Sequence, residues 1–371
     1  MRGQNEIGMI KLYGKERMVV KISVCIITKN EAHYLKGCLE KLSQYPFEIV
    51  VVDTGSEDDS VEVAKRYTDK VFEYGWHGDF SAARNYSVSC ATNDMIMIVD
   101  TDEFVQPFDY DAVIKLIEDN SKKVGRINLN NQYTRNDEKH STMEKLSRVF
   151  DRRLYKYEGI VHEQIVAKDG AEFETFEVPV EYLHVGYDGS PEILARKTQR
   201  NIELLLQELS KKEDPYILYQ LGKSFYMQGD YSEALDYFER ATGYDLNPAL
   251  EYVVDLVVSY GYALINTNQT KQALMFENLY EEFSYSADFV FLMGLIYMNN
   301  AFFEAAVNEF DKAKSYSSCN LNGVNSFLAD YNIGVIFECL GHVEEAIAYY
   351  KKCPDYEKAL NRIAVLTGQE G

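Results

Sequence analysis

Positive charge is scarce in this sequence. Its 371 residues include 38 lysines and arginines against 59 aspartates and glutamates, so the formal net charge is -21. A chain this acidic repels nucleic acid and anionic lipid surfaces, and we expect no nucleic-acid partner. An anionic substrate would need a local cation, either a metal ion or an arginine, to overcome this background.

Long apolar runs are also absent. The sequence has no stretch of about 18 apolar residues, the length that a membrane-spanning helix needs, so we expect no membrane span. Residues 1–21 are mildly basic but lack the apolar core of a signal peptide. We therefore expect a cytoplasmic protein.

Cysteines are few and do not cluster. The chain has no C-x-x-C pair and no histidine at a spacing typical of zinc ligands. We expect reduced thiols that are mostly buried. The six cysteines are Cys25, Cys38, Cys90, Cys319, Cys339 and Cys353.

The composition is that of a globular protein, with 46% hydrophobic and 26% charged residues. A disordered chain would be poorer in apolar residues. The length exceeds what one ordinary hydrophobic core organises, so we expect two domains, or three.

A short apolar run, Met95–Val99, ends abruptly in acidic residues. The run has the length of a buried central strand, and Asp100, Asp102 and Glu103 follow it. Ligands of open α/β sheets bind beyond the carboxyl ends of the strands, where carboxylates can hold a divalent cation against a phosphate group. An acidic turn with a purely structural role is the alternative at this stage.

Two similar strands precede this one. Residues 21–27 form a β-branched run that ends at T-K-N-E, and residues 48–52 form another that ends at D-T-G-S. Helical spacing follows the first strand over 34–42, and the acidic residues 57–60 suit a helix N-terminus after the second. This alternation predicts a parallel α/β sheet. Asp53, just after the second strand, is either a turn residue or an acceptor for a nucleoside hydroxyl.

These motifs together resemble glycosyltransferases of family 2 with the GT-A fold. Four ordered motifs carry the resemblance: T-K-N-E at 28–31, V-V-D-T-G-S at 51–56, W-x-x-D-F-S-A-A-R-N at 76–85 and D-T-D-E at 100–103. The resemblance implies a Rossmann-like domain that binds a nucleotide sugar and a divalent metal, Mg²⁺ or Mn²⁺. The donor-binding residues it implies are Thr28, Asn30, Glu31, Asp53, Asp79, Arg84, Asp100 and Tyr187. The metal ligands it implies are Asp102, Asp100 and His184, the last within an H-x-G-Y element.

The chemistry of sugar transfer agrees with these assignments. A nucleotide-sugar donor leaves as a diphosphate, so negative charge grows on the leaving oxygen. A metal at Asp102 would stabilise that charge as a Lewis acid, and Arg84 would add a charge-assisted hydrogen bond. A structural ion pair between Arg84 and a nearby carboxylate such as Asp79 is the alternative for this arginine.

A later segment contains the candidate base. R-x-F at 148–150 and G-x-x-H-E at 159–163 resemble elements of the branch of the family that carries appended helical repeats. An inverting transfer needs one group to take the acceptor's proton. The resemblance assigns that role to Glu163, with His162 as the second candidate. The alternative is that both residues only form hydrogen bonds within their loop.

Beyond residue 192 the pattern is helical. An amphipathic helix over 194–209 carries Arg196, Lys197 and Arg200 on its polar flank, and Pro215 marks a boundary. Four glycines are each followed twelve residues later by alanine, and in three cases sixteen residues later by an aromatic. These sets are Gly222, Ala234 and Phe238; Gly261 and Ala273; Gly294, Ala306 and Phe310; and Gly334, Ala346 and Tyr350.

The repeated segments resemble tetratricopeptide repeats, with an irregular second copy. The glycine and the alanine are expected where the two helices of a pair approach closely, and the aromatic is expected to fill the gap to the next pair. A stack of such pairs has a concave face of the kind that commonly binds peptide.

The sequence thus predicts an α/β GT-A (Rossmann-like) nucleotide-sugar-binding domain over 1–190, a linking helix over 191–214 and an all-α tetratricopeptide-like solenoid over 215–371. The resemblance extends to the S-glycosyltransferases that modify cysteines of glycopeptide bacteriocins of the sublancin type. It implies metal-dependent, inverting transfer of a hexose from a UDP-sugar to a peptide in the repeat groove, at a cysteine thiol or a serine hydroxyl. The alternatives are transfer to a cell-envelope glycan and a non-catalytic role as a repeat scaffold. For the assembly, the open alternative to a monomer is a homodimer.

Overall fold

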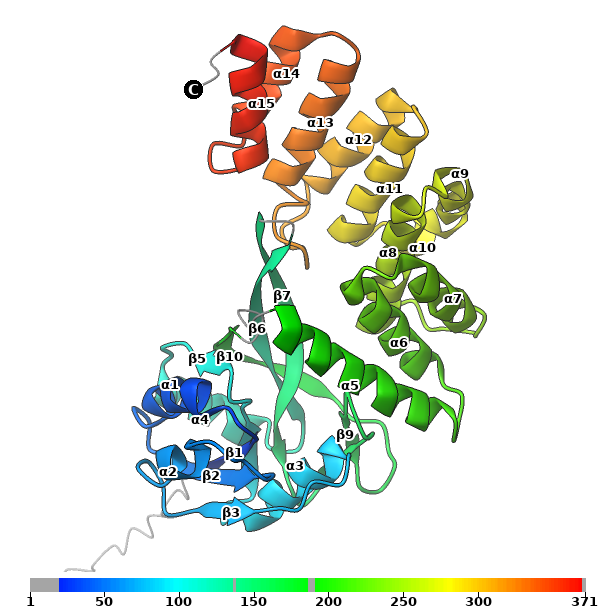
Figure 1. Ribbon diagram of the computed structural model, residues 1–371. Helices are drawn as coiled ribbons and strands as arrows, with labels where there is room; N and C mark the ends of the chain where they lie inside the picture. The colour runs from blue at the N-terminus through cyan, green and yellow to red at the C-terminus, as the bar shows by residue number, and fades with distance from the viewer. Residues whose placement is uncertain (1–19, 136–137, 186–190, 369–371) are drawn as a thin grey trace, which may run out of the picture.

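The computed structural model describes residues 20–135, 138–185 and 191–368. A mixed sheet flanked by helices forms the N-terminal part, and an array of paired helices forms the C-terminal part (Figure 1). The predicted order, an α/β domain followed by an all-α solenoid, is confirmed.

One 8-stranded sheet is the centre of the N-terminal part. Its strands are β1 (Ile22–Thr28), β2 (Glu48–Asp53), β3 (Val71–Glu73), β4 (Met95–Ile98), β5 (Glu103–Val105), β6 (Val124–Arg135), β7 (Glu138–Asp151) and β10 (Thr175–His184). Their order is β3-β2-β1-β4-β7-β6-β10-β5. The first four in that order are parallel, as predicted, and the others include antiparallel pairs. A smaller sheet pairs β8 (Tyr155–Glu158) with β9 (Gln164–Ala167).

Helices cover both faces of this sheet because its central strands are apolar on both sides. On one face, Val24 and Ile26 of β1 belong to the same core as Leu35 and Leu39 of α1. On the other face, Cys25 of β1 belongs to a core that includes residues of α3. The helices of this part are α1 (Ala32–Leu42), α2 (Ser60–Ala64), α3 (Phe80–Cys90) and α4 (Tyr110–Asp119).

The helical part begins with a long helix, α5 (Pro191–Leu209), which crosses the N-terminal part in Figure 1. The elements that follow are α6 (Pro215–Gln228), α7 (Tyr231–Thr242), α8 (Glu251–Asn266), α9 (Thr270–Ala273), η2 (Leu274–Leu279), α10 (Tyr280–Phe283), α11 (Ala287–Asn299), α12 (Phe303–Ala313), α13 (Phe327–Cys339), α14 (Val343–Tyr350) and α15 (Glu357–Thr367). No helix of the described residues is long and apolar enough to cross a membrane.

The repeat glycines lie where paired helices approach closely, as predicted. A Cβ atom on Gly294 would lie 2.7 Å from the ring of Phe310, and Gly222 is crowded by Phe238 in the same way. The aromatics also pack against the next pair, as predicted: Phe238 contacts Tyr260 of α8, with ring centroids 6.4 Å apart. Residues twelve and sixteen after the glycine are i and i+4 on the second helix, so both lie on the face that meets the glycine of the same pair.

The second repeat is irregular, as predicted. Its glycine, Gly261, packs against Leu292 of α11 rather than against an aromatic of its own pair. In place of one long second helix, this repeat has the short segments α9, η2 and α10.

A long hairpin formed by β6 and β7 reaches from the sheet to the repeats (Figure 1). Near its tip, Thr142 forms an isolated bridge with Leu321, and the Met143 N–H donates to the Asn320 carbonyl at 3.2 Å. The two parts of the protein are therefore joined both by α5 and by this hairpin.

All six cysteines are free thiols. The prediction of mostly buried thiols holds for three of them, while Cys339 is exposed and two are half-buried. The buried thiols are Cys25, Cys38 and Cys353.

Candidate active site

The carboxyl ends of β1, β2 and β4 meet at one edge of the sheet. Thr28 of β1 lies beside Asp53 of β2 in the strand register, and Cys25 of β1 lies beside Ile98 of β4. The motifs that end these strands are consequently neighbours in space, as is usual for ligand sites of open α/β sheets.

The turns after β1 and β2 are tied to each other. The Ser56 hydroxyl accepts the Asn30 N–H at 2.9 Å, and Asn30 Oδ1 accepts the Glu57 N–H at 2.7 Å. The Glu31 N–H donates to the Ser60 hydroxyl at 3.0 Å. Asn30 has a positive φ of 54°, a conformation that asparagine tolerates better than most residues. These bonds hold the predicted donor residues Asn30 and Glu31 against the loop that follows Asp53.

Two polar atoms at this edge are buried without a hydrogen-bond partner among the described residues. Asp53 Oδ2 accepts the N–H groups of Gly55 and Ser56, each at 3.0 Å, while Asp53 Oδ1 is left over. Thr28 Oγ1 is the second such atom. Leaving a buried polar atom unpaired costs about 1–3 kcal/mol, which a ligand that pairs with it would recover.

The acidic turn after β4 is held by a buried ion network. Asp100 accepts hydrogen bonds from Arg84 Nη2 at 3.1 Å and Arg148 Nη2 at 2.9 Å, and its own N–H donates to Glu103 Oε2 at 2.9 Å. Burial alone would raise the pKa of Asp100, but the two guanidinium groups outweigh it and hold that pKa well below the usual range. Asp100 is thus a permanent anion that serves as a counter-ion of two arginines.

Glu163 belongs to the same network. Arg84 Nε donates to Glu163 Oε1, and both side chains are largely buried, 8% and 10% exposed. The ion pair considered for Arg84 therefore forms with Asp100 and Glu163. The carboxylate of Asp79 instead caps α3, because its Oδ1 accepts the Ala82 N–H at 2.9 Å.

His162 has the left-handed backbone conformation, with φ of 50°. This conformation costs roughly 1–3 kcal/mol for a residue other than glycine and occurs most often at functional sites. Burial outweighs the nearby charge of Glu163 and lowers the pKa of His162, so the imidazole is neutral at pH 7. Its Nε2 is buried and finds no partner in the described part of the chain.

Asp102 and His184 lie together on the other side of the acidic turn. His184 Nε2 lies 3.4 Å from Asp102 Oδ2, and His184 Nδ1 lies 2.7 Å from Asn131 Oδ1, the contact that orients the ring. Burial would lower the pKa of His184, but Asp102 outweighs it and raises that pKa. Within residues 20–135, 138–185 and 191–368, no cluster of three or more potential metal ligands occurs. Asp102 and His184 are thus in contact with each other, while Asp100 is paired with Arg84 and Arg148.

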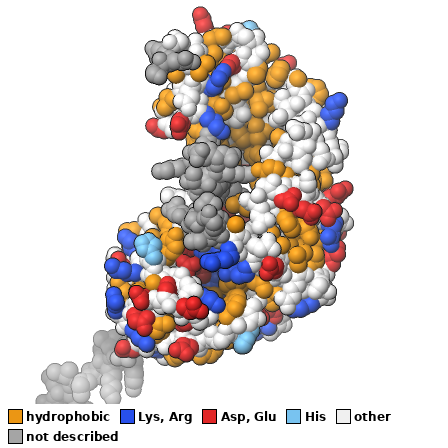
Figure 2. Space-filling view, viewed as in Figure 1, with side chains coloured by type: hydrophobic (Ala, Val, Ile, Leu, Met, Phe, Trp, Pro, Cys, Tyr) orange, Lys and Arg blue, Asp and Glu red, His pale blue; other side chains and the backbone are white. Residues whose placement is uncertain are grey.

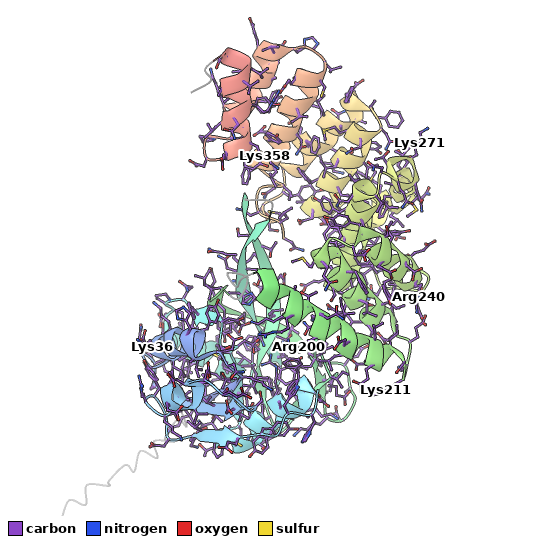
Figure 3. All side chains as sticks on the ribbon, viewed as in Figure 1. Lys36, Arg200, Lys211, Arg240, Lys271 and Lys358 are labelled. Atoms are coloured by element: carbon purple, nitrogen blue, oxygen red, sulfur yellow. The ribbon has the colours of Figure 1, made fainter. Side chains whose placement is uncertain are left out.

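Helix α5 lies over this edge of the sheet. Its apolar side joins a small core with Val161 and Phe80, through Ile202 and Leu205. Its polar side brings Lys197 to the site, with Nζ 3.1 Å from Glu31 Oε1. Figure 3 shows Arg200 on the stretch of α5 that crosses the N-terminal part.

The sequence does not single out several residues of the site. Arg148 belongs to the R-x-F segment without a role of its own, and nothing local distinguishes Asn131 within its strand. Lys197 lies on the predicted polar flank of its helix, but a sequence pattern does not tell which part of the molecule that flank meets. Tyr187, predicted to bind donor, lies outside the described residues.

Comparison with known proteins identifies both parts of the chain. Residues 23–169 match Glycosyl transferase family 2, and residues 215–246 and 331–360 match tetratricopeptide repeats. The N-terminal part is a family 2 glycosyltransferase domain with the expected GT-A-like sheet, and the C-terminal part contains tetratricopeptide repeats, as predicted from the motifs.

Curated relatives cover the chain in part. The glycosyltransferase SunS from the SPbeta prophage of Bacillus subtilis is 28% identical over 226 residues, which are 59% of this chain and 53% of SunS. An uncharacterized glycosyltransferase of Rickettsia felis is 36% identical over 22% of this chain and 29% of its own length. A TPR repeat-containing protein of Synechococcus elongatus is 38% identical over 23% of this chain and 21% of its own. The chain spans about half the length of SunS and less of the others.

Solved structures similar to the chain include YrrB, described as a TPR protein with an unusual peptide-binding site. It is 21% identical, with a TM-score of 0.37, over 46% of this chain and 86% of that one. MamA is 18% identical, with a TM-score of 0.36, over 50% of this chain and 99% of that one.

Proposed function

We propose that this protein is an inverting glycosyltransferase that transfers a sugar, expected to be a hexose, from a UDP-linked donor to a peptide. The observation that carries the proposal is the pair of buried, unpartnered atoms Thr28 Oγ1 and Asp53 Oδ1. They lie at the sheet edge where a nucleoside would bind, next to an acidic turn that can hold a metal. The match to Glycosyl transferase family 2 and the similarity to SunS support this donor class.

Asp102 and His184 would hold the divalent metal, expected to be Mg²⁺ or Mn²⁺. The 3.4 Å between His184 Nε2 and Asp102 Oδ2, with the ring oriented by Asn131, fits two ligands of one ion. Two protein ligands suit a metal that completes its coordination with substrate phosphates and water. When bound, the ion would stabilise the negative charge of the leaving diphosphate as a Lewis acid.

Glu163 would act as the base that accepts the proton of the acceptor. Its ion pair with Arg84 holds the carboxylate in place beside the site. A cysteine thiol, with an ordinary pKa of about 8.5, is already partly ionised near neutral pH, whereas a serine hydroxyl is not. A thiol acceptor therefore needs less help from this base than a hydroxyl does. In this scheme His162, neutral and next to Glu163, would orient the acceptor.

The first repeat helix supports a peptide acceptor. Gln164, next to the proposed base, donates to the Tyr216 hydroxyl of α6 at 2.8 Å. Tyr216 is in ring contact with Tyr219 and Tyr252, with centroids 5.9 and 5.2 Å away. An aromatic cluster on a tetratricopeptide repeat, in contact with the loop that carries the base, would let a bound peptide present a side chain to the site.

A glycan of the cell envelope is the second acceptor to consider, and a non-catalytic scaffold is the competing role. The buried network that orients Glu163 and Asp100 argues against a scaffold, because such a network is expensive to keep without a use. The cytoplasmic location, the homodimer and the two boundaries between the three predicted segments stay predictions.

The test is mass spectrometry of a peptide that contains cysteine and serine, incubated with the protein, Mn²⁺ and a panel of nucleotide sugars. We expect a gain of one hexose that disappears when the cysteines are alkylated beforehand. If the donor were hydrolysed in a metal-dependent reaction and no peptide gained mass, the proposal of a peptide acceptor would be overturned while the donor class would stand. Neither hydrolysis nor transfer with any donor would contradict the proposed activity.

A further inference from the structure

Helix α5 brings a lysine to the acidic edge of the sheet. Lys197 Nζ lies 3.1 Å from Glu31 Oε1 and 3.9 Å from Asp102 Oδ2. Its side chain is 34% exposed, so the ammonium group contacts two site carboxylates and still faces solvent. Lys197 lies beyond the residues 23–169 that match the family, and the sequence resemblance assigns it no role.

The two buried arginines of the site are already paired with carboxyl groups of the protein. Arg84 is paired with Asp100 and Glu163, and Arg148 is paired with Asp100 and Glu103. Both guanidinium groups are therefore engaged by buried carboxyl groups. A donor diphosphate is strongly negative, and in a protein with a net charge of -21 it needs cations from elsewhere.

Helix α5 carries those cations. Arg200 follows Lys197 by about one turn, and its guanidinium carbon lies 5.1 Å from the centroid of the Phe80 ring, which begins α3. Arg200 is close enough to Arg196 and to Glu31 for their charges to act on it. Arg196, Lys197 and Arg200 therefore form one basic stretch of α5. Figure 2 shows basic side chains gathered over the middle of the molecule, where α5 runs in Figure 1.

We propose that Lys197 binds the diphosphate of the donor, so that the linking helix completes the donor site. This inference rests on the proposed donor class. Before the donor binds, Glu31 and Asp102 hold the ammonium group beside the position of the phosphates. When the donor enters, Lys197 exchanges Asp102 for phosphate oxygens. A lysine suits this role because its flexible stem and three N–H donors can follow the diphosphate as negative charge grows on it.

The test compares two probes by isothermal titration calorimetry in the presence of Mn²⁺: UDP, which has the diphosphate, and uridine, which lacks it. Lys197→Ala should weaken UDP binding roughly tenfold, the loss of one charge-assisted contact, and leave uridine binding unchanged. Lys197→Arg should restore most of the UDP affinity. Lys211→Ala is the matched control, because Lys211 is an exposed lysine just beyond the other end of α5 (Figure 3).

Each outcome bears on the inference. Unchanged UDP affinity in Lys197→Ala would overturn it. An equal loss for UDP and uridine would also overturn it, because that pattern indicates a structural role for the lysine. Failure of the wild-type protein to bind either probe would instead remove the donor class itself, and the inference would fall with it.

Discussion

At the scale of single residues, the site is governed by how its buried charges are balanced. Arg84 links Glu163 to Asp100, so the proposed base and the acidic turn share one guanidinium group. Breaking a buried ion pair by removing one partner costs about 3–5 kcal/mol. The pair therefore fixes the position of Glu163.

The role of Glu163 leads to a prediction about the acceptor. Glu163→Gln keeps the size of the side chain but removes the proton acceptor, so transfer to a serine hydroxyl should fall by about 10²-fold or more. Transfer to a cysteine thiol should fall by only about tenfold, because the thiol is already partly ionised. Glu158→Gln, at an exposed position of the same segment, should leave both rates unchanged. An equal loss of transfer rate with thiol and with hydroxyl peptides would show that ionisation of the acceptor does not reduce the need for the base.

Glu48 begins β2, at the end of the strand opposite to the site. Its carboxylate accepts hydrogen bonds from Ser23, Lys70 and Thr92. Burial alone would raise its pKa, but these bonds outweigh burial and lower the pKa of Glu48 to about 2. A lowered folded-state pKa means that the carboxylate stabilises the fold above about pH 4.5 and loses that effect as the pH falls toward 2.

Glu48→Gln should accordingly lower the free energy of unfolding at pH 7 by about 1–2 kcal/mol, less than the pKa difference alone implies because water partly screens the contacts. The difference from wild type should shrink as the pH falls from 4.5 toward 2. Urea titrations between pH 7 and pH 3 measure both effects. A difference that stays constant over that range would show that the ionic contacts contribute nothing.

At the scale of elements, the repeat helices depend on glycines where no side chain fits. A Cβ atom on Gly294 would lie 2.7 Å from Phe310, so Gly294→Ala should force α11 and α12 apart and destabilise the protein by about 1–3 kcal/mol. Gly75→Ala is the control, because a Cβ atom there meets its nearest neighbour at 3.5 Å. Thermal unfolding followed by circular dichroism compares the two. If Gly294→Ala unfolded at the same temperature as the wild type, α11 and α12 would have space for an additional methyl group.

The elements also show what the sequence could predict. Strand ends were recognisable because apolar runs stop at polar motifs, and parallel strands necessarily bring those ends together. The Arg84–Glu163 pair was not recognisable, because 79 residues separate its partners and no local pattern links them. The position of Lys197 depends on how α5 packs against Val161 and Phe80, which is a property of the tertiary fold. The repeat period, by contrast, predicted the close approach at the glycines because that contact is local to each helix pair.

At the scale of the whole molecule, the β6–β7 hairpin joins the sheet to the repeats. Asp288 of α11 is central to this link: its buried carboxylate accepts the N–H groups of Asn320 and Leu321, each at 2.8 Å, and Leu321 bridges to Thr142 of the hairpin. Arg126 of β6 adds a double hydrogen bond to Glu251 of α8.

Asp288→Ala should therefore weaken the contact between the β6–β7 hairpin and the loop around Leu321. We expect faster amide hydrogen exchange in residues 141–146 and 317–326, since each of these segments loses support when the loop around Leu321 is released. Hydrogen exchange with mass spectrometry measures this, and Glu281→Ala, at an exposed position of α10, is the control. Faster exchange confined to 317–326 would show that the hairpin is held independently of the repeats.

In the proposed function, the sheet edge and α5 together form a site for a nucleotide diphosphate and a metal. The most direct measurement is a crystal structure of the protein with UDP and Mn²⁺, including an anomalous difference map for manganese. We predict uridine against Thr28 and Asp53, manganese between Asp102 and His184, and phosphate oxygens within hydrogen-bond distance of Lys197. UDP bound elsewhere, or manganese without contact to Asp102, would rule out this site.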